Sequence, residues 1–166
     1  MADHDDNGSS LAQRQQRRAA LAPGASAGIT EPMIRAVVHG FYGRIRQDAV
    51  LGPIFEGVIG DNWDHHLAKM CDFWSSVLLM TGRYEGRPMP AHIRIKVAEG
   101  MGLDEAHFER WFGLFRATVR ELCPPPAAAL FEDRAQRIAA SLLQGVRFSR
   151  GEMPEWLGPV KSEATS

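Results

Sequence analysis

Between about residues 30 and 148, apolar side chains recur at intervals of three and four, which is the period of an amphipathic helix. No segment shows the alternation expected of a β-strand, so we predict an all-α fold. The first helix is predicted to begin at Thr30, whose side chain can cap it, with Pro32 in the first turn. Its apolar face comprises Ile34, Val37, Val38, Phe41 and Ile45.

The segment 48–55 interrupts this pattern, and we expect it to be a loop that carries Ile54 and Phe55. We expect Asp61 to cap a second helix that ends at Thr81 and Gly82. This helix has a broad apolar arc made of Trp63, Leu67, Met70, Cys71, Phe73, Trp74, Val77 and Leu78.

Residues 82–91 contain two glycines and two prolines, which predict a loop. A short helix is expected around His92–Val97. Asp104 is positioned to cap a long helix, which the sequence CPPP at 123–126 ends. A last helix is predicted from about Ala127 to about Phe148.

The two ends of the chain differ from this central part in composition. Residues 1–27 have few large apolar side chains and predict a flexible extension, in which a solvated basic helix could form. We expect a single globular domain over 28–150 and a tail over 151–166, in which Trp156 and Leu157 favour docking onto the domain.

Composition narrows the classes of function. The chain has 166 residues, 45% hydrophobic content and a formal net charge of −1, so we expect neither nucleic acid nor a membrane surface as partner. There is no apolar run of transmembrane length and no signal-peptide pattern, which leads us to expect a cytoplasmic protein. We also expect a monomer. Cys71 and Cys123 are too few for a thiolate zinc site.

Two adjacent histidines lie in the first turn of the second helix. On a helical wheel of about 100° per residue, His66 falls within about 40° of Met70, Phe73 and Val77, so it points toward the apolar interior. His65 falls on the polar side and is predicted to be exposed. A buried imidazole needs hydrogen-bond partners, so His66 is either a satisfied core residue or part of a binding site.

His92 is a second candidate, because it follows two prolines and starts a short helix whose rigid turn would fix the direction of its ring. Read alone, it is either a surface residue or a metal ligand. There is no HExxH motif, nucleophile elbow or phosphate-binding glycine loop. The many aromatic residues are compatible with plain core or with a slot for a flat apolar macrocycle, whose iron one histidine could ligate.

Several segments, in order, resemble group III truncated haemoglobins, which are short globins with a two-over-two helical sandwich around haem. The matching segments are GFYGRIRQDAVLGPIF (40–55), NWDHHLAKMCDFWSSVLLMTGRYEGRPMPAHIRI (62–95), HFERWFGLF (107–115) and, less closely, RAQRIAASLLQG (134–145). Met80 stands where this resemblance leads us to expect a glycine, which affects only the end of the helix.

The resemblance implies haem b as cofactor and His92 as the proximal ligand of its iron. It implies that Tyr42, His66 and Trp111 line the opposite, distal face. The remaining residues implied to contact haem are Phe55, packed flat on it, Lys69, reaching a propionate, and the wall residues Phe41, Phe73, Trp74 and Phe115.

The implied function is binding of dioxygen and related diatomic ligands such as carbon monoxide and nitric oxide. The three distal side chains offer O–H and N–H donors that would slow the release of dioxygen. The alternative is a redox enzyme, a nitric oxide dioxygenase or a peroxidase-like enzyme acting on peroxide, which needs an external electron donor. A haem-based sensor is a third possibility, for which the sequence shows no output domain.

Overall fold

The computed structural model describes residues 6–95 and 102–152, and every element in these ranges is a helix. The prediction of an all-α fold is therefore confirmed. None of the described helices is long and apolar enough to cross a membrane. The helices are α1 (Asp6–Leu21), α2 (Pro23–Ser26), α3 (Glu31–Gln47), α4 (Leu51–Ile59), α5 (Trp63–Leu79), α6 (Pro88–Ile93), α7 (Glu105–Leu122) and α8 (Pro125–Ser149).

Two of the predicted helix starts are confirmed by their caps. The side chain of Thr30 accepts a hydrogen bond from the main-chain nitrogen of Met33 at 3.3 Å, which satisfies one of the free N–H groups of α3. The Asp104 side chain accepts a hydrogen bond from the main-chain nitrogen of His107, and the His107 ring accepts one at Nδ1 from the main-chain nitrogen of Asp104. This reciprocal arrangement fixes the start of α7.

The expectation of a loop over 48–55 is wrong, because α4 begins at Leu51. Asp48 satisfies the start of this helix by accepting from the nitrogens of Val50 at 3.0 Å and Leu51 at 2.9 Å. Pro53 lies in the first turn, where its missing N–H costs no hydrogen bond, so it is compatible with the helix.

Other boundaries also differ from the prediction. Asn62 rather than Asp61 precedes α5 and makes no side-chain cap. The helix ends at Leu79, and Met80 adopts the left-handed conformation (φ 56°) that usually belongs to glycine. The short helix α6 begins at Pro88, four residues before the position we predicted.

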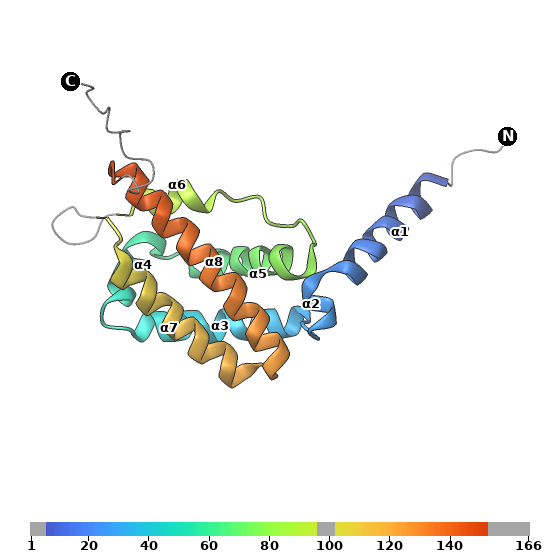
Figure 1. Cartoon of the computed structure of the whole chain (residues 1–166), viewed down its shortest axis with the longest axis horizontal. Coiled ribbons are helices and arrows are strands. Elements are labelled where there is room, and N and C mark those ends of the chain that lie inside the picture. Colours follow the sequence, from blue (N-terminus) through green and yellow to red (C-terminus); the bar gives the residue numbers. More distant parts are fainter. Residues whose placement is uncertain (1–5, 96–101, 153–166) are drawn as a thin grey trace, which may run out of the picture.

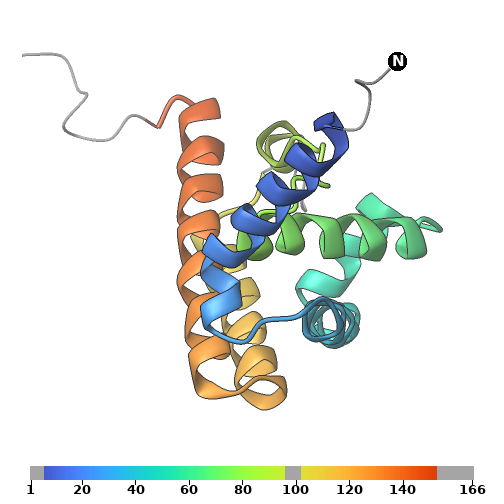
Figure 2. The same cartoon turned by 90° about the vertical axis from the view of Figure 1, so that its right-hand side faces the viewer.

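Four of the helices form two packed pairs, α3 with α5 and α7 with α8. α7 and α8 lie antiparallel, joined by the proline-rich turn, and α3 packs against both α5 and α7 (Figures 1 and 2). The core between them includes Phe115 and Phe131, neither of which is exposed to solvent. The short helix α6 rests on α8, which places it beside the space enclosed by the two pairs.

The N-terminal helix α1 projects from this body (Figures 1 and 2), and Leu11 and Leu21 on it are exposed. By contrast, α2 packs against α5, and Ala22 and Gly24 are buried. The last part of the predicted extension thus contacts the helical body. The predicted docking of Trp156 and Leu157 concerns residues outside those that the structure describes.

Candidate functional site

A cavity of about 250 Å³ lies among α3 to α8. Most of its lining is aliphatic or aromatic, with a few polar groups that point inward, which is the usual character of a small-molecule site. Eight of the ten residues predicted from the sequence lie on its wall: Tyr42, Phe55, His66, Lys69, Phe73, Trp74, His92 and Trp111.

His92 lies on α6, on the side of the cavity formed by this short helix. Its Nδ1 is 2.6 Å from the carbonyl oxygen of Pro88. A carbonyl can only accept a hydrogen bond, so Nδ1 carries the proton and Nε2 retains its lone pair. This is the tautomer in which Nε2 can ligate a metal, with the ring oriented by its other nitrogen.

His66 reaches the cavity from α5, as the helical wheel predicted, while His65 is exposed. The Nε2 atom of His66 is buried and has no hydrogen-bond partner among the described residues. Burial, which is the largest cause, and the nearby Lys69, His65 and His92 together lower the pKa of this imidazole to about 4. His66 is therefore neutral at pH 7, and its Nε2 is a buried polar atom that none of the described residues satisfies.

Tyr42 packs against the same histidine from α3. The two ring centres are 4.9 Å apart and the planes are perpendicular. The Tyr42 side chain is 7% exposed, and burial, followed by interaction with Tyr84, raises its pKa well above the ordinary value. Tyr42 therefore keeps its O–H, which can donate a hydrogen bond.

Trp111 forms another part of the wall from α7. It stacks on Phe115 with ring centres 5.6 Å apart and an interplanar angle of 5°, and it meets Phe41 edge-on at 5.4 Å. Phe41 and Phe115 are buried behind this wall and do not line the cavity. Their packing fixes the position of the Trp111 indole, whereas the resemblance implied that both contact haem directly.

Three residues at the edge of the cavity carry charge or a hydroxyl: Lys69 on α5, and Tyr84 and Arg87 on the connection from α5 to α6. Lys69 and Arg87 are exposed, and the Lys69 Nζ is 6.0 Å from the centre of the Tyr84 ring. Tyr84 also packs edge-on against Phe73 at 5.1 Å. The edge of the cavity is thus positive and suited to carboxylates.

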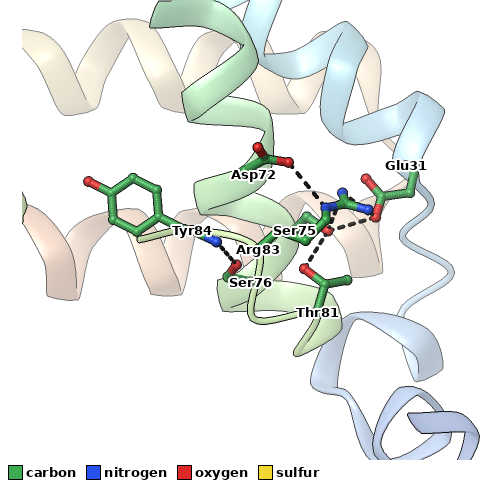
Figure 3. Close-up of polar contacts among 7 residues, drawn as sticks. All are labelled: Glu31, Asp72, Ser75, Ser76, Thr81, Arg83 and Tyr84. Carbon is green, nitrogen blue, oxygen red and sulfur yellow. Dashed lines mark hydrogen bonds and ion pairs between the residues drawn. The ribbon is translucent and has the colours of Figure 1, made fainter. Parts of the chain in front are cut away.

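A polar cluster fixes the start of this connection, as Figure 3 shows. Arg83 donates to Glu31 at 2.8 Å, to Asp72 at 3.1 Å and to the hydroxyl of Ser75 at 2.9 Å. The fully buried Ser75 donates in turn to Glu31 at 2.6 Å and is 3.0 Å from the Thr81 hydroxyl. The cluster ties the segment that leads to His92 to both α3 and α5.

No family model matches this chain. The group 3 truncated haemoglobin ctb of Campylobacter jejuni is 31% identical over 115 residues, which are 68% of this chain and 87% of that protein. The crystal structure of the group III truncated haemoglobin from Campylobacter jejuni superimposes with a TM-score of 0.65 at 30% identity, covering 71% of this chain and 91% of the other. The chain belongs to the group 3 truncated haemoglobins. The resemblance read from the sequence is thereby confirmed, and so is the globin fold.

Membership of this globin family implies a haem cofactor. Four features of the residues around the cavity fit such a group. A histidine with a free Nε2 lone pair comes from one side, and the buried, unpartnered Nε2 of His66 comes from another. The wall between them is mainly apolar, and the rim carries Lys69 and Arg87.

Sequence reasoning missed several residues on the wall of this truncated haemoglobin. Tyr84 and Arg87 lie in the segment interpreted only as a loop, one on each side of Gly86. The others are mainly apolar residues, and an apolar side chain by itself does not predict contact with a cavity: Ile54, Ile59, Met70, Leu103, Phe108, Ile138 and Leu142.

Proposed function

We propose that this truncated haemoglobin binds haem b and, through it, dioxygen and related diatomic ligands. His92 is the proximal ligand in this proposal, and Tyr42, His66 and Trp111 face the diatomic ligand. The observation that carries the proposal is that one cavity contains all four side chains, with His92 in the tautomer that leaves Nε2 free.

A hydrogen bond to the carbonyl of Pro88 orients the His92 ring for this role. The short Nδ1–H bond fixes both the direction of the ring and the position of its proton. Lys69 and Arg87 would hold the haem carboxylates at the rim, and Phe55, Phe73 and Trp74 would contact the macrocycle. The mainly apolar wall excludes water from the space between these groups.

Haem, once bound, would supply the iron at which a diatomic ligand could bind, and hydrogen-bond donors nearby would favour a ligand with partial negative charge. The Tyr42 O–H and the Trp111 indole N–H would donate to it, and neutral His66 can present an N–H as well. Hydrogen bonds to charged acceptors contribute roughly 1.5–3 kcal/mol each. Because each 1.4 kcal/mol is tenfold, two such bonds slow release by about 100-fold or more. Carbon monoxide, which is less polar, gains less.

The test is the dissociation rate of dioxygen, measured by stopped-flow absorbance on the haem-loaded chain. Tyr42→Phe removes only the hydroxyl, and we expect dissociation to accelerate by about tenfold or more, as the loss of one charged hydrogen bond requires. Tyr84→Phe, which removes a hydroxyl at the rim, is the matched control and should change the rate little. An unchanged rate in both Tyr42→Phe and Trp111→Phe contradicts the proposal.

A redox enzyme is the alternative function, and it would need an external electron donor. A peroxidase-like mechanism would use His66 to move a proton to and from peroxide. A pKa of about 4 makes His66 a weak base, poorly matched to proton transfer at neutral pH. Nitric oxide dioxygenation does not require His66 to transfer a proton. Repeated turnover with a reductant would distinguish this activity from simple binding.

A further inference from the structure

Three side chains from three helices meet beside the cavity wall: Arg46 on α3, Glu56 on α4 and Trp63 on α5. The indole N–H of Trp63 donates to Glu56 Oε2 at 3.0 Å, and Arg46 Nε donates to Glu56 Oε1 at 2.7 Å. The Arg46 guanidinium also lies 4.6 Å from the centre of the Trp63 ring. We refer to Arg46, Glu56 and Trp63 as the indole latch.

Each member of the indole latch neighbours a residue of the cavity wall on its own helix. Arg46 lies one turn after Tyr42 on α3, and Trp63 lies one turn before His66 on α5. The Trp63 ring contacts both of these residues, with centres 6.0 Å from Tyr42 and 5.8 Å from His66. The Trp63 ring therefore supports the rings of Tyr42 and His66, which both line the cavity.

The exposures of the three residues show which contact matters most. The Arg46 and Glu56 side chains are 49% and 43% exposed, so their ion pair contributes little by itself. Trp63 is only 7% exposed, and its N–H needs an acceptor to remain in that buried position. The bond from Trp63 to Glu56 thus holds the ring, and Arg46 orients the carboxylate that accepts it.

We propose that the indole latch is a positioning device that keeps the His66 ring directed into the cavity. The inference rests on the proposed function in one respect, since it assigns the device to the face that receives the diatomic ligand. When the Trp63 N–H loses its acceptor, the indole moves, the ring of His66 loses one of its two aromatic neighbours, and Nε2 gains access to water.

The experiment compares four variants of the full chain. Trp63→Phe keeps an aromatic ring and removes the N–H, and Glu56→Leu removes the acceptor. Glu56→Gln keeps an acceptor oxygen and removes the charge. Glu132→Leu breaks a similar arginine–glutamate pair between α7 and α8, away from the cavity, and is the matched control.

The first measurement is the titration of the His66 imidazole by ¹⁵N NMR, which needs no haem. We expect its pKa to rise by about one unit in Trp63→Phe and Glu56→Leu, because water reaches the ring. Glu56→Gln and Glu132→Leu should titrate like the wild type. Far-UV circular dichroism establishes that each variant is folded, and Glu56→Leu, at a half-exposed position, keeps the test decisive if Trp63→Phe does not fold.

The second measurement is the infrared band of carbon monoxide on the haem-loaded chain, which reports the polarity beside the ligand. We expect Trp63→Phe and Glu56→Leu to redistribute this band and the two other variants to leave it unchanged. An unchanged band and an unchanged His66 titration in folded Trp63→Phe would overturn the proposal, as would a Glu56→Gln protein that behaves like Glu56→Leu. A chain that takes up no haem would refute the proposed function, while the titration would still decide the role of the indole latch.

Discussion

Replacement of Asp48 by asparagine tests how the corner between α3 and α4 is held against α7. The carboxylate accepts from the nitrogens of Val50 and Leu51, and both of its oxygens accept from Arg110 Nε at 2.7 and 2.8 Å. The hydrogen bond from Arg110 is the largest cause that lowers the pKa of Asp48 to about 2, and the two main-chain bonds lower it as well. Trp111 is the next residue on α7, so this contact also bears on the cavity wall.

The size of the effect follows from that pKa. The ordinary aspartate value is about 3.9, and the difference from about 2 corresponds to at most roughly 2.5 kcal/mol of folding stability at pH 7. Asp48 is 7% exposed, but Arg110 is 47% exposed, which weakens the pair, so we expect a loss of about 1–2 kcal/mol in Asp48→Asn. Because the folded-state pKa is lowered, this stability is complete above about pH 4 and is lost as the pH falls through about 2.

Urea unfolding followed by far-UV circular dichroism measures this difference in the free energy of unfolding. At pH 7 we expect Asp48→Asn to be less stable than the wild type, and we expect the gap to shrink as the pH falls from 5 to 2. Asp133→Asn, which disrupts an exposed pair with Arg137, is the control and should change stability by less than about 1 kcal/mol. A gap that is the same at pH 2 and pH 7 would refute the reasoning.

Three further substitutions have outcomes that follow from single contacts. Met80→Gly should raise the free energy of unfolding by about 0.5–1 kcal/mol in urea titrations, because Met80 has a left-handed backbone; lower stability would contradict this. Gly24→Ala should lower the melting temperature by a few degrees, since a Cβ would lie 2.7 Å from the Leu78 carbonyl oxygen, and an unchanged value would mean that α2 does not pack there. Arg83→Ala should cost about 1 kcal/mol and speed hydrogen exchange in the segment leading to α6, because it removes half-exposed contacts to Glu31 and Asp72 while Ser75 keeps its bond to Glu31; unchanged exchange would show that the cluster does not hold this segment.

Local signals in the sequence predicted much of this fold. Thr30 and Asp104 cap their helices through atoms three residues away, so residue type and spacing were enough. The helical period of α5 was also enough to predict that His66 points toward the interior and that His65 is exposed. The prediction of a loop after Asp48 failed because the interrupted apolar pattern was taken as the end of helical structure, whereas Asp48 supplies the acceptor that starts α4.

The candidate site was predictable only where a resemblance supplied the three-dimensional arrangement. No spacing in the sequence brings His92 to the same cavity as Trp111, because the two lie on different helices. The indole latch has no sequence signal either, since Glu56 and Trp63 have ordinary polar and apolar patterns by themselves. The positions of Phe41 and Phe115 behind the wall depend on packing that residue type does not specify.

Resonance Raman spectroscopy of the haem-loaded, ferrous chain tests the central claim most directly, because it detects the bond between iron and an imidazole. The account predicts this signal in the wild type, its loss in His92→Gly, and its return when free imidazole is added to the variant. A His92→Gly protein that holds the same amount of haem and shows the wild-type signal without added imidazole would contradict the account.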